Sequence, residues 1–320
     1  MTIQRRTLLA AGAGLALAPS ARAEEWPTKP IRIVVPYAPG GGTDIFARAL
    51  SDSLRGRLGQ PVVVENRAGA NGVVGAEQVM RSPPDGTTFA VCTGAHVINK
   101  YSMRSIPFHP VNDFTPIALL SSFPLCIAVN GRAFRDLAGM IKAAKEKPGS
   151  VSFGTTEAAT SFAGNNFARM AGLTMTEVPY RGSGPMLNDL VAGHLPTCVT
   201  STVSVLPYIQ DERIRVLAVT SDTRSGLLPH VPTIAESGVP GYEFTAWYGM
   251  YAPPALPAPI AGRMAGAIEE SLHEPALRAR LLELGADVKP IVLGSFATFL
   301  QRDDARWAQA AREGLINVSQ

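Results

Sequence analysis

Residues 31–50 read IRIVVPYAPGGGTDIFARAL, and this stretch contains the unit from which the fold is built. The apolar, β-branched run IRIVV is typical of a strand covered on both faces of a sheet. From about Thr43 to Leu58 the pattern changes, and apolar side chains recur every four residues from Phe46 onward, which predicts a helix. A strand joined to a helix by a glycine-rich turn indicates an α/β protein.

The same alternation of strand-like and helix-like runs continues along the chain. Strand-like runs are PVVVEN, TTFAVCT, VSFGT, TEVPY, PTCVTS and IRVLAVTS, and amphipathic runs between them predict helices at 75–80, 135–145, 162–170 and 186–192. The final third is mostly helical, with predicted helices at 259–272, 276–284 and 295–311. This order predicts an α/β fold with a mainly parallel sheet.

The glycine loop, Gly40 to Gly42, lies where the first helix is expected to begin, with Gly42 or Thr43 as its N-cap residue. The first turn of a helix has free N–H groups and a partial positive charge, so a loop without side chains there suits an anion. The chain lacks the sequence of a nucleotide P-loop, and Ile45 stands where a dinucleotide-binding loop has its third glycine. A small carboxylate or an inorganic oxyanion fits best. The alternative is a turn that only joins strand to helix.

Asp44 follows in the first helical turn, where its charge stabilises the helix dipole. Because that charge also repels a nearby anion, Asp44 is expected either to bond backbone donors or to accept from a hydroxyl or amine of a ligand. Arg181, in VPYRGSGP, is a candidate partner for a second carboxylate. A surface position is the alternative for this arginine.

Two further strand-to-helix junctions are rich in small or hydroxyl-bearing residues. They contribute Gly94, Ala95 and His96 in VCTGAH, and Thr155, Thr156, Thr160 and Ser161 in VSFGTTEAATSFAGNNF. Ligands of open α/β sheets gather at the carboxyl ends of strands. The three junctions therefore predict a single ligand-binding cleft.

The sequence contains no recognisable catalytic or metal-binding pattern. No G-x-S-x-G motif occurs, and the five histidines lack the spacing of a helical metal pair. Cys92, Cys126 and Cys198 are widely spaced in apolar runs, which predicts buried free thiols, with pairing of two of them as the alternative. We therefore expect no enzyme, no metal and no cofactor, although residues distant in sequence can meet in a fold.

Residues 1–23, MTIQRRTLLAAGAGLALAPSARA, have a basic start, a short apolar stretch and an A-x-A cleavage site ending at Ala23. They predict an export signal and a periplasmic protein, and the pair Arg5-Arg6 is compatible with a twin-arginine (Tat) leader and with a general secretory (Sec) leader alike. Cleavage removes three arginines from the 29 basic residues and no acid, which leaves 26 residues of each sign. A neutral mature chain argues against nucleic acid or an anionic membrane as a partner.

Seven stretches together resemble one family along the whole mature chain: the tripartite tricarboxylate transporter substrate-binding receptors, also called Bug receptors. They are WPTKPIRIVVPYAPGGGTDIFAR, VVVENRAGANGVVGAEQV, PFHPVNDFTPIALLS, VPYRGSGPMLNDLVAG, LPYIQDERIRVLAVTS, VPTIAESGVPGYEFTAWYGMYAPPALP and FLQRDDARWAQ. The resemblance implies a type II periplasmic binding protein, which has two α/β lobes, a central cleft and two hinge crossings. One lobe would hold residues 24–122 plus 246–320, and the other residues 123–245.

The resemblance also implies a function. A monomer would capture a small organic carboxylate by lobe closure and deliver it to the membrane permease of the transporter. In the family, the first glycine loop holds a carboxylate largely through backbone donors and water, and the loop after the strand near residue 150 meets it from the other lobe. Carried over, this implies ligand contacts from Tyr37, Gly41, Gly42, Thr43 and Asp44 on one side, and from Thr155, Thr156, Thr160 and Ser161 on the other.

Two departures from the family pattern fall at the expected cleft. The second loop is shorter, with Ser161 in place of a histidine, and Thr200 and Ser201 stand where many members have an Asp-Asn pair. The far end of the ligand is therefore open to dicarboxylates, tricarboxylates, aromatic acids, acidic amino acids and nicotinate-like compounds. An exported α/β hydrolase acting on a carboxylate ester is the alternative function.

Overall fold

The computed structural model describes residues 26–209, 213–283, 285–286 and 288–316. The expected export signal, with its cleavage site after Ala23, lies outside these residues. Within the described ranges, every helix is too short or too polar to cross a membrane.

Strands and helices alternate largely as the sequence predicts. The strands are β1 (Ile31–Val35), β2 (Val62–Asn66), β3 (Thr88–Thr93), β4 (Thr115–Asn130), β5 (Ser152–Thr155), β6 (Thr176–Pro179), β7 (Thr197–Ser201), β8 (Ile214–Val219), β9 (Thr245–Ala252) and β10 (Ile291–Val292). The helices are α1 (Gly42–Leu58), α2 (Val73–Met80), α3 (Ala95–Ser102), α4 (Leu137–Glu146), α5 (Ala158–Met170), α6 (Ser183–Ala192), α7 (Thr202–Val205), α8 (Ala258–His273), α9 (Pro275–Glu283) and α10 (Leu293–Arg312). Short 3-10 turns occur at Ala70–Gly72 and Leu206–Tyr208.

The strands pair in the order β2-β1-β3-β9-β4-β7-β5-β6, with β8 and β10 also paired to β4. Strand β1 runs parallel to β2 and β3, and β5 runs parallel to β6 and β7. Each antiparallel pairing in the described residues involves β4 or β9. The prediction of a mainly parallel sheet is therefore wrong. It rested on the strands that lead into helices, whereas β4 and β9 pair with each other and run antiparallel to the neighbouring strands.

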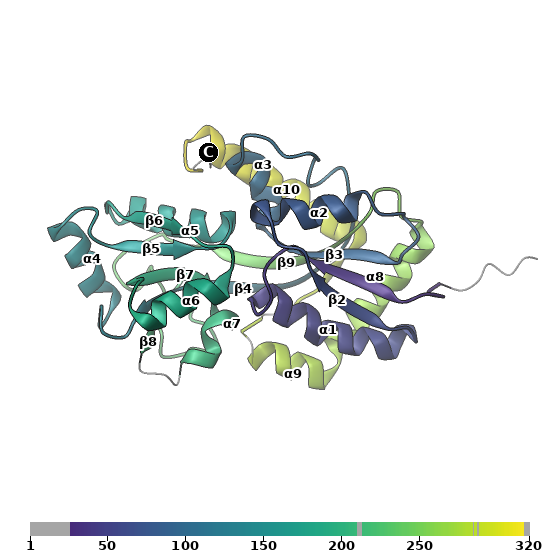
Figure 1. Ribbon diagram of the computed structural model, residues 1–320, viewed down its shortest axis with the longest axis horizontal. Helices are drawn as coiled ribbons and strands as arrows, with labels where there is room; N and C mark the ends of the chain where they lie inside the picture. Colours follow the sequence, from purple (N-terminus) through teal and green to yellow (C-terminus); the bar gives the residue numbers. More distant parts are fainter. Residues whose placement is uncertain (1–25, 210–212, 284, 287, 317–320) are drawn as a thin grey trace, which may run out of the picture.

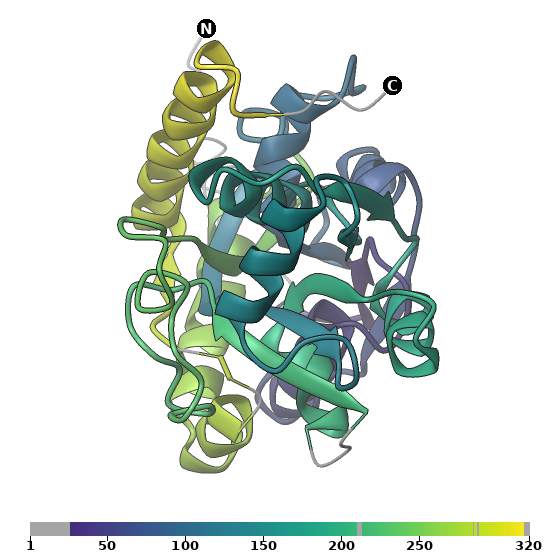
Figure 2. The same cartoon turned by 90° about the vertical axis from the view of Figure 1, so that its left-hand side faces the viewer.

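Strands β4 and β9 join two lobes that lie side by side in Figure 1. Over residues 115–124, β4 pairs with β9, and over residues 125–130 it pairs with β7 and β8. Lobe 1 contains β1 to β3 and α1 to α3, and lobe 2 contains β5 to β8 and α4 to α7. The C-terminal helices return to lobe 1, because α8 packs on α1 and α10 packs on α3 (Figures 1 and 2).

The point where β4 passes from one lobe to the other is held by Thr220, which follows β8. Its buried hydroxyl oxygen accepts from the amide of Leu125 at 2.8 Å and donates to the carbonyl of Phe244 at 2.7 Å. This side chain thus ties the end of β8 to both crossing segments. The three cysteines are free and buried, as predicted.

Candidate functional site

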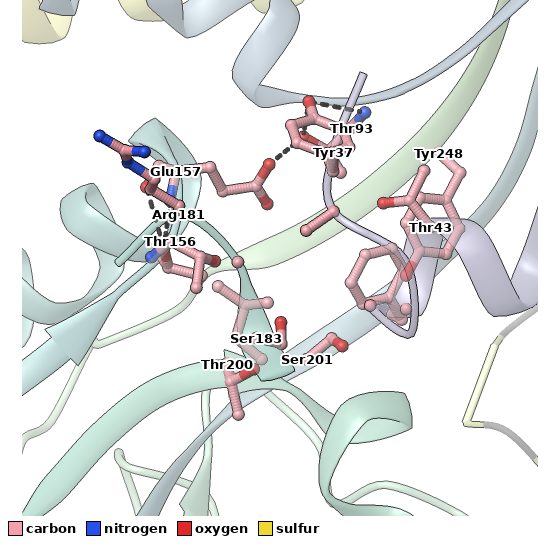
Figure 3. Close-up of a pocket in the computed structure, with 17 residues that line it drawn as sticks. Tyr37, Thr43, Thr93, Thr156, Glu157, Arg181, Ser183, Thr200, Ser201 and Tyr248 are labelled. Carbon is pink, nitrogen blue, oxygen red and sulfur yellow. Dashed lines mark hydrogen bonds between the residues drawn. The ribbon is translucent and has the colours of Figure 1, made fainter. Parts of the chain in front are cut away.

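A cavity of about 50 Å³ lies where the two lobes meet (Figure 3). Its lining comes from Tyr37, Ala38, Gly41, Gly42, Thr43, Thr93 and Tyr248 on the lobe 1 side, from Phe123 and Leu125 of the crossing strand β4, and from Thr156, Glu157, Thr160, Arg181, Gly182, Ser183, Thr200 and Ser201 on the lobe 2 side. The predicted site residues that the fold brings together here are Tyr37, Gly41, Gly42, Thr43, Thr156, Thr160, Arg181, Thr200 and Ser201.

The glycine loop forms one wall of the cavity. Gly41 is the N-cap of α1, one or two residues before the cap expected at Gly42 or Thr43, and among the described residues the amides of Gly41, Gly42 and Thr43 have no hydrogen-bond partner. A Cβ atom on Gly42 would lie 2.5 Å from the hydroxyl oxygen of Tyr248 and 2.7 Å from Oγ of Ser201, so only glycine fits. The loop therefore brings unpaired backbone donors to the cavity at a helix start.

Tyr248, from β9, packs behind this loop. Its ring lies against Phe46 of α1 and Phe123 of β4, with ring centroids 5.0 Å and 4.2 Å away. Burial raises the pKa of the Tyr248 hydroxyl well above its ordinary value, so the group is neutral where it meets Thr43. The packing fixes Tyr248 in place and leaves little room for adjustment beside the glycine loop.

Glu157 is a cavity residue that the sequence analysis missed. Its carboxylate extends from the start of α5 toward lobe 1 (Figure 3), where the Thr93 hydroxyl donates to Oε2 at 2.7 Å. The Tyr37 hydroxyl lies 2.9 Å from Thr93 Oγ1, so the acid joins a polar group that spans both lobes. Burial raises the pKa of Glu157 to about 7, against the opposing effect of the hydrogen bonds from Thr93 and Tyr37. The sign of this role in the sequence is an acid at the start of a helix, within a junction that is otherwise rich in hydroxyl-bearing residues.

Other hydroxyls of lobe 2 lie together on another side of the cavity (Figure 3). Ser201 is the N-cap of α7, where its Oγ accepts from the amide of Ser204, and Ser183 begins α6. Thr200 Oγ1 is buried, and it has no hydrogen-bond partner within the described part of the chain. A buried hydroxyl without a partner is uncommon in proteins, and a bound ligand would satisfy it.

Two further predicted residues, Thr160 and Arg181, line the cavity but are less available to bind a ligand. Thr160 Oγ1 accepts from the amides of Thr156 and Glu157 at 3.0 and 3.1 Å, so it holds the start of α5. Arg181 is exposed at the rim, and its guanidinium points away from the other labelled side chains (Figure 3).

The structure places some predicted site residues outside the cavity: Asp44, Gly94, Ala95, His96, Thr155 and Ser161. Asp44 accepts from the amide of Gly40 and from the side chains of Arg48 and Asn66, each at 3.0 Å. Burial opposes its ionisation, but these hydrogen bonds hold the pKa of Asp44 below its ordinary value. Asp44 therefore secures the glycine loop, which is the first of its two expected roles.

His96 belongs to the core of lobe 1. Its imidazole lies among the rings of Phe108, Phe114 and Tyr251, and Nε2 donates to the carbonyl of Pro110 at 3.0 Å. Burial lowers the pKa of His96 to about 4, so the ring is neutral at ordinary pH. The expectation that His96 faces the ligand is not met, because the first turn of α3 points it inward.

Other residues that were predicted to bind the ligand also lie outside the cavity because of the direction in which they point. Gly94 lies against Trp247, whose indole nitrogen would be 2.9 Å from a Cβ at this position. Thr155 and Ser161 line an adjoining pocket that shares Thr156 and Glu157 with the cavity, and there Thr155 Oγ1 donates to Glu177 at 2.7 Å. Neighbouring residues at a strand end point to opposite sides, so a donor-rich junction contributes only some of its side chains to a cleft.

Comparison with known proteins agrees with this architecture. A family model described as "Tripartite tricarboxylate transporter family receptor" matches residues 46–314. BugT of Bordetella pertussis is 33% identical over 95% of this chain and 94% of its own. The solved periplasmic binding protein BugD is 28% identical, with a TM-score of 0.87 over 92% of this chain and 100% of its own.

Two other solved structures contain carboxylates. An R. palustris protein with adipate is 32% identical, with a TM-score of 0.88 over 92% of this chain, and MatC from Rhodopseudomonas palustris with bound malate is 28% identical, with a TM-score of 0.83 over 89%. Both matches cover 100% of the known chain. The protein has the periplasmic binding protein fold, with two lobes around a central cleft, and it belongs to the tripartite tricarboxylate transporter receptor family.

Proposed function

We propose that this protein captures a small organic carboxylate between its lobes and delivers it to the membrane permease of a tripartite tricarboxylate-type transporter. The observation that carries the proposal is the set of unpaired amides at Gly41, Gly42 and Thr43, which line the cavity at the start of α1. Such donors bind a carboxylate through hydrogen bonds and through the helix dipole. The relatives with adipate and with bound malate support the same ligand class.

The number of available donors is sufficient for useful affinity. Hydrogen bonds to a charged group contribute about 1.5–3 kcal/mol each, and micromolar binding requires about 8 kcal/mol. About five such bonds reach this value before the cost of ordering the ligand is subtracted. The amides of the glycine loop together with the hydroxyls of Thr200 and Ser201 offer that many, so the proposal needs no arginine in the cavity.

We infer capture by lobe closure, with lobe 1 formed by residues 24–122 plus 246–320 and lobe 2 by residues 123–245. In support, β4 changes its pairing partner between residues 124 and 125, two residues from the first boundary, and β9 begins at Thr245, next to the second. The lobes already touch at several points, including the hydrogen bond from Thr93 to Glu157. A ligand that contacts both walls favours the closed arrangement by its differential affinity for that state.

A receptor role requires no catalysis, and we propose that the protein is not an enzyme. Among the described residues, no histidine lines the cavity, so the cavity lacks the pairing of a serine or threonine hydroxyl with a histidine that many hydrolases use. An exported hydrolase of carboxylate esters is therefore the weaker alternative. The proposal also includes an export leader of the Tat or Sec type that ends at Ala23, a periplasmic location and a monomeric receptor.

A thermal-shift screen of mono-, di- and tricarboxylates, with recovery and quantification of each ligand, tests the function. A ligand that binds only the folded state stabilises it by about 2.7 kcal/mol at a hundredfold excess over its Kd. The expected result is a raised unfolding midpoint with at least one acid and full recovery of that acid. Hydrolysis of a carboxylate ester would support the enzyme instead, and the absence of any shift would refute carboxylate capture.

A further inference from the structure

Glu157 gives this cavity a feature that a plain carboxylate site does not need. Among the described lining residues it is the one acid, and its partners are the hydroxyls of Thr93 and Tyr37 and the amide of Thr160 rather than cations. Arg181 is the one basic residue that the described part of the chain contributes to the lining, and its guanidinium points away from the acid (Figure 3). An acid in this position opposes a second negative charge beside it.

The hydrogen bonds around Glu157 are all directed toward it. The amide of Ala95 donates to Thr93 Oγ1 at 3.2 Å, which leaves the Thr93 hydroxyl proton for the carboxylate. The amide of Thr93 donates to the Tyr37 hydroxyl oxygen at 3.4 Å, which leaves the Tyr37 proton for Thr93 Oγ1 or the acid. A carboxylate is an acceptor only, so this chain of donors favours its ionised form.

The cavity thus has two chemically different ends. The glycine-loop amides and the unpartnered Thr200 hydroxyl offer donors, which suit a carboxylate. Glu157 lies away from Thr200 and Ser201 in Figure 3 and offers an acceptor, which suits a donor. A ligand that satisfies both ends carries a carboxylate and a separate hydrogen-bond donor.

We propose that the cleft selects a small organic acid that bears a hydroxyl or ammonium group besides its carboxylate, and that Glu157 accepts the hydrogen bond from this group. This inference rests on the proposed function and narrows its ligand class. An ammonium group also neutralises the charge of Glu157. A second carboxylate in the same place must be accompanied by a proton on one of the two acids.

The two kinds of ligand differ in their response to pH. The pKa of Glu157 is about 7, so a dicarboxylate that binds with uptake of a proton loses affinity between pH 6 and pH 8, whereas a donor-bearing acid does not. The other titratable groups that interact with Glu157 are Tyr37, Tyr248 and Cys92, and burial raises the pKa of each so that all three are neutral in this range.

The test uses two ligand series of equal length that differ at one end. Butyrate, 4-hydroxybutyrate, 4-aminobutyrate and succinate form the four-carbon series, and propionate, 3-hydroxypropionate, 3-aminopropionate and malonate form the three-carbon series. Isothermal titration at pH 6 and pH 8 compares the mature protein with Glu157→Gln. Glu177→Gln is the matched control, because Glu177 is a hydrogen-bonded acid of lobe 2 that lies outside the cavity.

At pH 8 the unmodified protein is expected to bind a hydroxy or amino acid about tenfold to a hundredfold more tightly than the dicarboxylate of equal length. Glu157→Gln should lose the preference for the hydroxy or amino acid and the pH dependence of dicarboxylate affinity, and Glu177→Gln should keep both. The difference between the hydroxy and amino members shows which donor is preferred. Unfolding midpoints of both variants establish that they are folded.

Three outcomes overturn the inference in distinguishable ways. A dicarboxylate that binds most tightly, with affinity falling as the pH rises, would show that Glu157 takes up a proton and would leave carboxylate capture intact. An unchanged ligand order in Glu157→Gln would show that Glu157 does not set selectivity. Failure of every acid in both series to bind would count against carboxylate capture itself, and the inference would fail with it.

Discussion

Replacing Gly182 by alanine is expected to hold the lobes apart without harming either lobe. Gly182 is the N-cap of α6, and its extended backbone (φ 161°, ψ 167°) accommodates any residue. A Cβ atom there would lie 2.7 Å from Cβ of Ala38, which belongs to lobe 1. The next nearest atom is Cα of the same Ala38, at 3.9 Å. The clash is therefore confined to the closed arrangement.

The size of the effect follows from this distance. Carbon atoms pack at about 3.5–4.0 Å, so the lobes must separate by about 1 Å at this point. Overpacking of this kind costs about 1–3 kcal/mol. If closure bears the whole cost, ligand binding weakens by about fivefold to 150-fold. The unfolding midpoint of the unliganded protein should change little, because an open arrangement relieves the clash.

Gly184→Ala is the control, since a Cβ atom at Gly184 meets nothing within 4 Å and the position lies two residues further along α6. Isothermal titration with a carboxylate that raises the unfolding midpoint gives the affinity, and small-angle scattering with and without that ligand gives the degree of closure. Equal affinity and equal compaction in the Gly182 and Gly184 variants would refute the idea that the ligand is held by closure at this contact.

Two other substitutions test the cavity wall and its acid. Gly42→Ala places Cβ 2.5 Å from the Tyr248 hydroxyl oxygen. It is expected to lower the unfolding free energy by about 1–3 kcal/mol and to abolish the ligand-induced shift of the unfolding midpoint. Gly41→Ala is the control and should do neither, because the atom nearest to its Cβ lies 3.6 Å away. The pKa of Glu157 is about 7 in the folded protein, against an ordinary value of 4.5. The folded state therefore holds the proton of this acid more tightly than the unfolded state, and the resulting stabilisation is complete below about pH 4.5 and is lost as the pH rises through 7. Urea titrations at pH 5 and pH 8 should therefore show the unmodified protein losing up to about 3 kcal/mol relative to Glu157→Gln, and equal pH slopes would contradict this.

The helices and the parallel strands could be predicted because each has its own local pattern. Strand β4 could not, since its sequence, TPIALLSSFPLCIAVN, is interrupted by Pro116 and Pro124. Proline removes a backbone donor and normally ends regular pairing. Here the pairing register shifts between Pro116 and Ala118, and the strand changes partner after Pro124. The irregularities that hid the strand are thus the places where it bends from one lobe into the other.

In the candidate site too, some residues could be predicted from the sequence and others could not. The glycine loop could be predicted because its chemistry is contained in consecutive residues. Glu157 could not, because its role depends on Thr93, which lies 64 residues earlier and in the other lobe. His96 was expected to face the ligand from a junction of the right composition, but three aromatic rings hold it in the core. Composition predicts which junctions meet, whereas side-chain direction is decided by packing.

Glu157 also connects ligand choice to the opening of the lobes. Opening breaks its hydrogen bond to Thr93 and returns the carboxylate to water, and water favours the ionised form that burial disfavours. High pH therefore assists opening of the unliganded protein, whereas a ligand donor that reaches the carboxylate opposes it. Because a carboxylate can accept several hydrogen bonds, a ligand can add its own to the one from Thr93 without replacing it. Recognition of the donor and retention of the ligand would then rest on the same side chain, and lobe 2 would contribute selectivity while the glycine loop of lobe 1 contributes the common carboxylate contact.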